Sequence, residues 1–222
     1  MQPAAGTFLA ALDDGDAETL RSLGTMRRYA PGAALFWEGE ESSHVAVVLA
    51  GRVKVAAAAA DGTEALLAVR GPGELLGELA VLDGAPRSAT ATALDAVAVR
   101  LIDGVEFEQF LATRPGAAVA LLHLLVRRLR ESGRRRAEFG SQDVAARLAG
   151  RLLELADEHG EPDGDGIRVT VPLTQDDLAG MVGASRESVA RALRTLREAG
   201  LVATGRRSIT VVDPTRLRRR GP

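Results

Sequence analysis

Three side chains near the C-terminal end of the chain, Arg186, Glu187 and Arg191, are of the types that can read base-pair edges. An arginine guanidinium can donate two hydrogen bonds to O6 and N7 of guanine, and a glutamate carboxylate can accept one from N4 of cytosine. At about 100° per residue, a helix beginning near residue 186 places all three in one arc of roughly 140°. Ala190 and Arg194 share that arc, and the separate apolar side holds Val189, Ala192, Leu193 and Leu196. The pattern favours a helix in the major groove of DNA, and the alternative is a solvated face of Glu–Arg pairs.

The residues before this helix carry the signals of a tight turn between two helices. Thr174 and Asp177 have the spacing of a capping box, which begins a helix. Gly183 ends that helix, and the Ser185 hydroxyl can cap the next one. A helix from about residue 142 to 158, an acidic glycine-rich loop and a strand at 167–171 precede the pair, and a hairpin at 202–212 follows it. The sequence therefore predicts a winged helix-turn-helix.

A second group of residues, near the middle of the chain, has the chemistry of an anion site. Gly77 allows a close backbone approach to a ligand, and the turn after it exposes N–H groups at the start of a helix. Arg87 and Ser88 add a positive charge and a hydroxyl that suit a phosphate, and Glu78 could accept from a ribose hydroxyl. The alternative is an ordinary glycine-rich surface turn. A dinucleotide fingerprint is rejected because the glycines at 71, 73 and 77 miss its spacing.

The elements around this group read as β-structure. After short helices at about 5–23, brief apolar runs are broken by Gly, Asp and Pro, which is typical of an antiparallel barrel or jelly roll. The Asp61-Gly62 pair is a hairpin turn signal. The expected strands are 26–29, 34–37, 45–49, 53–58, 65–69, 89–93 and 96–102.

A long helix is expected from Pro115 to about Gly140. Alternating steps of four and three residues mark a seam of the kind that a two-stranded coiled coil requires. The alternative is one helix packed on its own barrel, because Leu121 and Leu124 widen the apolar stripe. The polar Ser132 and Arg136 destabilise simple packing of the seam and suggest that something else sits beside that part of it. The seam consists of Ala118, Leu122, Leu125, Leu129, Ser132, Arg136 and Phe139.

Composition narrows the function classes. The 222 residues include no cysteine, which excludes disulfides, thiolate-held iron–sulfur clusters and thiol switches. The scattered His44, His123 and His159 offer no paired metal or haem ligands, so we expect neither metal, haem nor an enzyme such as a phosphodiesterase. The net charge is -2, yet residues 186–222 hold ten arginines against three acids, a basic C-terminal patch. Without a long apolar run or a signal peptide, a cytoplasmic protein with no membrane partner is expected.

Both groups of residues resemble parts of one family. Residues 173–191 resemble the helix-turn-helix of the CRP/FNR family of transcription regulators. Residues 73–80 with 83–89, and residues 31–39, resemble the phosphate-binding cassette region of cyclic-nucleotide domains. The resemblance covers nearly the whole chain and implies an α+β fold. Its parts are a cyclic-nucleotide-binding β-barrel or jelly roll at 1–114, a dimerisation helix and hinge at 115–141, and a winged helix-turn-helix at 142–222.

The resemblance also implies roles in ligand binding. Glu78 would hold the ribose 2′-hydroxyl, Arg87 and Ser88 the cyclic phosphate, and Gly77 a backbone contact, with Leu79 in the same segment. Ser132 falls where the cyclic-AMP receptor has a threonine that touches adenine. The next position, Gly133, departs from the family serine that reaches the base from the partner chain, so one base contact is lost. The loop before Arg87 also looks one residue shorter. The implied effector is cAMP or a related cyclic nucleotide, and the alternatives are a different effector or none.

For DNA, the resemblance implies a homodimer on a palindromic, TGTGA-like operator. Arg186, Glu187 and Arg191 would read its bases, while Arg206 and Arg207 in the wing would contact phosphates. Thr174 and Ser185 belong to the same expected DNA-binding set. RNA polymerase is the expected further partner, with the loop at 159–166 as the candidate contact. The out-of-class alternative is a cyclic-nucleotide regulatory subunit without DNA function, which the helix bearing Arg186 argues against.

Overall fold

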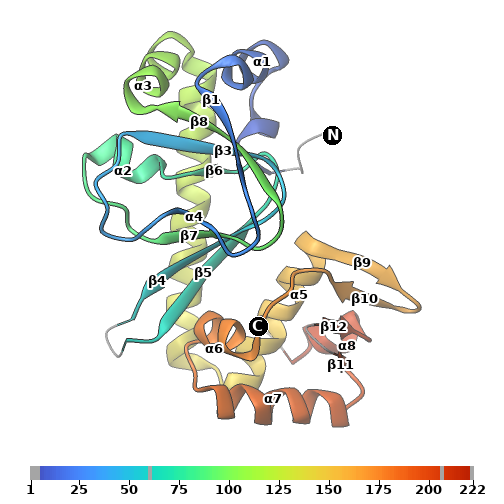
Figure 1. The fold of residues 1–222 in the computed structure, drawn as a ribbon. Coiled ribbons are helices and arrows are strands. Elements are labelled where there is room, and N and C mark those ends of the chain that lie inside the picture. Colours follow the sequence, from blue (N-terminus) through green and yellow to red (C-terminus); the bar gives the residue numbers. More distant parts are fainter. Residues whose placement is uncertain (1–5, 60–61, 206–207, 221–222) are drawn as a thin grey trace. The chain divides into compact units, whose positions relative to one another are not determined.

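A computed structural model describes residues 6–59, 62–205 and 208–220 of the chain (Figure 1). Contacts divide the chain into two compact units. Unit 1 comprises Met1–Ala58 and Leu67–Ser132, and unit 2 comprises Ala59–Leu66 and Gly133–Pro222. The three-part division at 114 and 141 stays a prediction.

Unit 1 is built on two four-stranded antiparallel sheets with the orders β1-β8-β3-β6 and β2-β7-β4-β5. All seven strands expected from the sequence are present, each with its ends within two residues of the expected ones. They form the two sheets of a jelly roll and not one closed barrel. The strands are β1 (Thr25–Tyr29), β2 (Ala34–Phe36), β3 (His44–Ala50), β4 (Val53–Ala58), β5 (Glu64–Arg70), β6 (Leu75–Leu76), β7 (Thr90–Ala93) and β8 (Val97–Asp103). The sequence did not predict β6, whose two residues are too few to show alternation. The Asp61-Gly62 turn falls partly outside the described residues.

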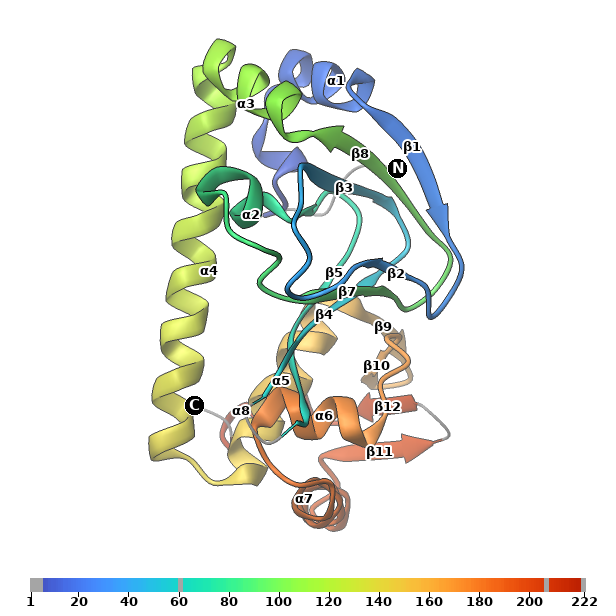
Figure 2. The same cartoon turned by 60° about the vertical axis from the view of Figure 1, so that its left-hand side comes forward.

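Helices cover one end of the sheets (Figures 1 and 2). They are η1 (Leu9–Ala11), α1 (Asp14–Ser22), α2 (Glu78–Asp83), α3 (Gly104–Thr113) and the start of α4 (Pro115–Ser141). Phe8, Phe107 and Phe110 pack together there, with ring centroids 6.4 Å apart in each successive pair. Helix α3 was not predicted from the sequence, although Asp103 caps it by accepting a hydrogen bond from the Val105 N–H. This apolar cluster anchors α4 to unit 1.

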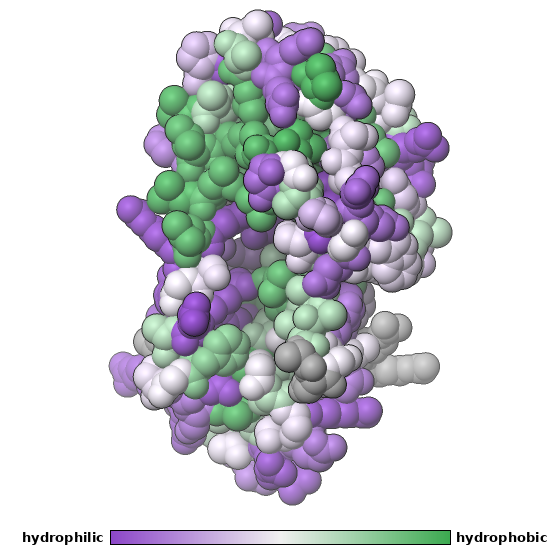
Figure 3. Space-filling model, turned by 90° about the vertical axis from the view of Figure 1, so that its left-hand side faces the viewer, coloured by the Kyte–Doolittle hydropathy of each residue, from purple (hydrophilic) through white to green (hydrophobic). Residues whose placement is uncertain are grey.

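Helix α4 has a buried face and an exposed apolar face. Leu121 and Leu124 pack into the core of unit 1, as the single-chain alternative required. Leu122 and Leu129 are 60% and 72% exposed, and Leu125 is half-buried. Figure 3 shows hydrophobic side chains gathered on the side of unit 1 that carries α4. One face of α4 therefore packs into the core of unit 1, while much of the predicted seam remains exposed.

Within the described residues, unit 2 combines the end of α4 and four further helices with a four-stranded sheet of order β11-β12-β10-β9. Its elements are α5 (Val144–His159), β9 (Gly160–Asp163), β10 (Gly166–Val169), α6 (Gln175–Val182), α7 (Arg186–Glu198), β11 (Val202–Gly205), β12 (Ser208–Val211) and α8 (Pro214–Arg218). Each helix buries an apolar stripe against the others, with Leu148, Leu152, Leu178 and Leu196 almost fully buried. The expected wing is present as β11 and β12.

The expected acidic loop at 159–166 is wrong in part, because residues 160–163 form strand β9. Backbone pairing with β10 sets this structure, with Gly166 opposite Asp163 and Val169 opposite Gly160. Gly164 makes the turn with a φ of 61°, a left-handed conformation that favours glycine. Strand pairing therefore outweighs the loop-like composition of this segment.

Within the described residues, no single helix is long and apolar enough to cross a membrane. Helices α3 and α4 reach that length and apolar composition only when taken together, and they are bent by 112° relative to each other.

Candidate functional site

The expected anion site lies in unit 1, where β6 turns into α2. Gly77 adopts a φ of 77° and precedes Glu78, the first residue of α2. Arg87, from the loop before β7, donates hydrogen bonds to the Gly77 carbonyl at 2.9 Å and to the His44 carbonyl at 2.7 Å. Its guanidinium lies 4.1 Å from the centre of the Phe36 ring. The structure therefore brings Gly77, Glu78 and Arg87 together, as the sequence analysis expected.

Gly77 leaves the space that the Arg87 guanidinium occupies. A Cβ atom at residue 77 would lie 1.9 Å from Arg87 Nη1. Both Glu78 and Arg87 are only 3% exposed. Burial lowers the pKa of Arg87, and the negative charges of Glu78 and Glu40 oppose that effect. This turn thus holds a charged guanidinium below the surface, where an interaction with an anion is screened little by water.

Arg128 of α4 is a site residue that the sequence analysis missed. Its guanidinium donates to Glu78 Oε1 at 2.6 Å, to Glu74 Oε2 at 2.9 Å and to the Leu75 carbonyl at 2.9 Å. The signal that could have found it is its position one helical turn before Ser132, on a helix already expected to line the site. Arg128 balances the buried charge of Glu78.

The remaining predicted ligand residues are more exposed than Glu78 and Arg87. Ser88 follows Arg87 and is exposed, and Leu79 on α2 is 46% exposed. Ser132 is exposed on α4, next to Gly133. Neither a hydrogen bond nor an ion pair joins any of these three described residues to Arg87, so their roles in ligand binding stay predictions.

A loop after β2 holds the backbone of Arg87. The Gly39 N–H donates to the Arg87 carbonyl, and the Arg87 N–H donates to the Glu40 carbonyl, both at 2.8 Å. Trp37 in this loop is 58% exposed and is the only tryptophan in the chain. Its fluorescence therefore comes from a single position beside the site.

The second group of predicted residues forms a helix-turn-helix in unit 2. Asp177 N–H donates to Thr174 Oγ1 at 3.1 Å, and Thr174 N–H donates to Asp177 Oδ2 at 2.8 Å, so the capping box is confirmed. Gly183 ends α6 in a left-handed conformation with a φ of 57°. The Ser185 hydroxyl caps α7 by accepting from the Ser188 N–H at 3.2 Å.

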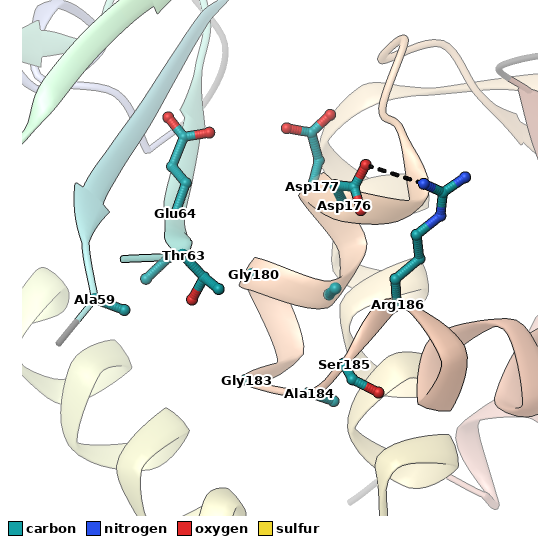
Figure 4. Close-up of a pocket in the computed structure, with 12 residues that line it drawn as sticks. Ala59, Thr63, Glu64, Asp176, Asp177, Gly180, Gly183, Ala184, Ser185 and Arg186 are labelled. Atoms are coloured by element: carbon teal, nitrogen blue, oxygen red, sulfur yellow. Dashed lines mark ion pairs between the residues drawn. The ribbon is translucent and has the colours of Figure 1, made fainter. Parts of the chain in front are cut away.

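Helix α7 has the two faces that the sequence predicts. Val189, Ala192, Leu193 and Leu196 are buried, whereas Arg186, Glu187 and Arg191 are exposed. Arg191 donates to the Ser188 hydroxyl at 2.9 Å, and Arg186 lies 3.8 Å from Asp176 of α6 (Figure 4). Bonds from its own backbone N–H and from the Ser185 hydroxyl lower the pKa of Glu187, and Arg191 and Arg186 lower it further. Arg206 and Arg207 lie outside the described residues.

The start of α5 is tied to the turn of the helix-turn-helix. Arg147 donates to the Val182 carbonyl at 2.9 Å and to the Gln142 carbonyl at 2.6 Å. Its guanidinium also lies 5.3 Å from the centre of the Phe139 ring. Phe139 lies against Gly183, where an added Cβ atom would be 2.5 Å from the ring. Phe139 is 48% exposed, and its predicted place in a dimer seam is untested.

Comparisons with known proteins match both parts of the chain. Residues 26–114 match the family model of the cyclic nucleotide-binding domain, and residues 146–220 match that of the Crp-like helix-turn-helix domain. The CRP-like cAMP-activated global transcriptional regulator of Mycobacterium tuberculosis is 37% identical over 85% of this chain and 84% of its own. The cyclic AMP receptor protein of Thermus thermophilus is 31% identical over 86% and 85%.

Solved structures agree. A CRP-family transcriptional regulator from Thermus thermophilus has a TM-score of 0.74 at 29% identity, over 87% of this chain and 95% of its own. The c-di-GMP-responsive regulator CLP of Xanthomonas campestris has a TM-score of 0.78 at 23% identity over 90% and 100%, a likeness that shows the fold alone. These relatives are transcription regulators and not enzymes. The chain belongs to the CRP/FNR family of transcription regulators, with a cyclic nucleotide-binding domain and a DNA-binding helix-turn-helix domain.

Proposed function

We propose that this regulator is a homodimer whose binding to palindromic DNA is controlled by a cyclic nucleotide, with cAMP as the first candidate. The observation that carries the proposal is the meeting of two buried opposite charges, Glu78 and Arg87, at the Gly77 turn. A cyclic nucleotide offers a phosphate to the guanidinium and a ribose hydroxyl to the carboxylate. The names of the Mycobacterium and Thermus relatives support the same ligand class.

Within the ligand site, each residue has a separate task. Arg87 and Ser88 bind the cyclic phosphate, the Gly77 backbone approaches the ligand, and Glu78 accepts from the ribose 2′-hydroxyl. Leu79 lies beside them in the same segment. Residues 1–114 form the effector domain, 115–141 the dimerisation helix and hinge, and 142–222 the DNA-binding domain.

The nucleobase is the least constrained part of the ligand. Ser132 supplies one hydroxyl for adenine, whereas Gly133 has no side chain to supply another. The alternative is a different effector in place of cAMP, such as cGMP or a cyclic dinucleotide. Calorimetric titration of the full chain with cAMP, cGMP and cyclic di-GMP decides between them. Binding of cAMP that Arg87→Gln weakens and Arg28→Gln, on exposed β1, leaves unchanged would support the proposed site.

The exposed face of α7 reads the DNA. Arg186 and Arg191 bind guanines and Glu187 binds a cytosine of a TGTGA-like half-site, while Thr174, Ser185 and the wing arginines Arg206 and Arg207 bind phosphates. Each well-formed arginine–guanine pair discriminates against a wrong base by about 1–3 kcal/mol. Loss of Arg186 should therefore abolish sequence preference more than it weakens binding to any duplex.

Fluorescence anisotropy with a labelled TGTGA palindrome and a scrambled duplex tests this assignment. We expect preferential binding of the palindrome only with cyclic nucleotide present, and loss of the preference in Arg186→Ala. Arg168→Ala, which removes an equally charged and exposed side chain from β10, is the matched control. Equal binding of both duplexes by the unmodified protein would contradict the operator, and binding unaffected by cAMP would contradict the effector.

The exposed apolar face of α4 is the proposed dimer interface. Leu122, Leu125, Leu129 and Phe139 would form its seam, and a second copy removes these side chains from water. Sedimentation velocity should show a dimer, and Leu129→Gln should shift it toward monomer. Val105→Gln, which changes an equally exposed apolar residue on α3, should leave the dimer intact.

RNA polymerase is the proposed further partner. The hairpin of β9 and β10 exposes Glu161, Asp163 and Asp165, which give it an acidic tip. Replacement of these acids should lower activated transcription in a purified system while leaving DNA affinity unchanged.

A further inference from the structure

Asp176 places an acid beside one of the two arginines expected to read bases. It lies in the first turn of α6, 71% exposed, with its carboxylate 3.8 Å from the guanidinium of Arg186, which is 64% exposed. Figure 4 shows the two side chains reaching toward each other from the two helices of the motif. The helix-turn-helix thus contains an ion pair at the position of a DNA contact.

The neighbouring acid does not share this position. The Asp177 carboxylate accepts from the Thr174 N–H at 2.8 Å and from the Thr174 hydroxyl at 2.7 Å, so it serves the start of α6. Arg191 is held by a neutral group, the Ser188 hydroxyl. Among the described residues, Asp176 is therefore the acid that forms an ion pair with a reading arginine, and it can compete with DNA for Arg186.

The competition differs between DNA sequences. On guanine, Arg186 gains a bidentate pair that exceeds the strength of an exposed ion pair. On a phosphate it gains a contact between exposed charges, which is comparable with the ion pair that it gives up. The Asp176 carboxylate is also repelled by nearby phosphates, and phosphate contacts supply essentially all of the affinity for non-specific DNA.

We propose that Asp176 is a specificity-determining residue. Its ion pair restrains Arg186 until a guanine takes the place of the Asp176 carboxylate. This restraint weakens binding to DNA of other sequence. The inference rests on the proposed function in one respect, that Arg186 reads a base. Asp176 would then contribute to discrimination between DNA sequences without touching a base itself.

The test compares Asp176→Asn with the unmodified full chain at saturating cAMP. One duplex carries the site that the unmodified protein selects from a random-sequence pool, and the other carries the same bases scrambled. We expect affinity for the scrambled duplex to rise by about two- to fivefold in the variant. Affinity for the selected site should rise by a smaller factor, so that the ratio of the two affinities falls. On the scrambled duplex, the slope of log affinity against log salt should steepen by about 0.9, the value for one added phosphate contact.

Two further variants separate this role from a general change in charge. Glu161→Gln removes an equally exposed acid that pairs with Arg168 at 3.2 Å, on the sheet edge opposite the wing, and should leave both affinities unchanged. Asp176→Glu keeps the negative charge and should retain the original ratio of affinities.

The inference would be overturned if Asp176→Asn raised the affinity for both duplexes equally or did not raise the affinity for the scrambled duplex. It would also be overturned if Glu161→Gln had the same effect. Each of these results leaves the proposed function intact as long as the unmodified protein selects a site. An unmodified protein that selects no sequence would overturn the proposed function and this inference together.

Discussion

A methyl group added at residue 77 should disable the ligand site by displacing Arg87. In Gly77→Ala, the new Cβ atom would lie 1.9 Å from Arg87 Nη1 and 2.8 Å from Cζ, distances at which something must move. The backbone at this turn has a φ of 77° and is bonded through its carbonyl to the same guanidinium. Because Arg87 is a side chain held by the Gly77 and His44 carbonyls, the guanidinium is the group that moves.

The expected loss of stability has two parts. An alanine in the left-handed conformation costs about 1–2 kcal/mol. Displacement of Arg87 loses at least one charge-assisted hydrogen bond, worth about 1.5–3 kcal/mol. The free energy of unfolding of unit 1 should therefore fall by about 2.5–5 kcal/mol. The affinity for cAMP should fall by at least about tenfold, since one such bond to the phosphate is lost.

A double-mutant cycle separates the two parts. In an Arg87→Met background the guanidinium is absent, so Gly77→Ala should cost only the backbone strain of about 1–2 kcal/mol. Urea unfolding followed by the fluorescence of Trp37 reports on unit 1, because that unit contains the single tryptophan. Effects that add to within about 0.5 kcal/mol would refute the steric link between residue 77 and Arg87.

Three further predictions concern pH and the turn of the DNA-binding motif. Burial and the charge of Arg87 lower the pKa of His44 below its usual 6.5, so the folded state binds this proton less tightly than the unfolded state. The stability that this neutral histidine allows should be fully present above about pH 6.5 and should be lost as the pH falls below that value. In His44→Gln, the urea midpoint should no longer show this dependence on pH. Hydrogen bonds lower the pKa of Glu187 from its usual 4.5, so cytosine discrimination in anisotropy assays should persist to a lower pH than an unshifted glutamate would allow. Gly183→Ala places a Cβ atom 2.5 Å from the Phe139 ring and should lower the unfolding temperature in calorimetry. Phe139→Ala in the same chain should recover part of that loss. If the two changes in unfolding temperature simply add, residue 183 and the Phe139 ring are not in contact.

Local signals in the sequence predict much of this fold. The buried side of α7 follows from the spacing of Val189, Leu193 and Leu196, because a helix repeats every 3.6 residues whatever its neighbours are. The capping box of Thr174 and Asp177 lies within four residues, so its bonds depend on local geometry alone. Seven strands are predicted because alternation and turn residues are equally local.

Contacts between distant segments could not be predicted in this way. Arg128 and Glu78 are separated by 50 positions, and only the packing of α4 against the sheets brings the guanidinium to the carboxylate. Strand β9 has a loop-like composition of Gly, Glu, Pro and Asp, and it exists because β10 supplies its hydrogen-bond partners. Family resemblance predicts a role for Glu78, but it does not predict Arg128 as the partner that neutralises this carboxylate.

The charged groups of both sites already have partners within the chain. Arg87 is held by two carbonyls, Glu78 by Arg128, and Arg186 by Asp176. A ligand or a base therefore either displaces one of these interactions or uses an atom that they leave open, such as Arg87 Nε, which has no hydrogen-bond partner among the described residues. Sulfate could bind the guanidinium of Arg87 but has no hydroxyl from which Glu78 could accept a hydrogen bond. A nucleotide with a free ribose 2′-hydroxyl offers a partner to both groups, so on the proposed function the hydrogen bond to Glu78 distinguishes the effector from an anion without a hydroxyl.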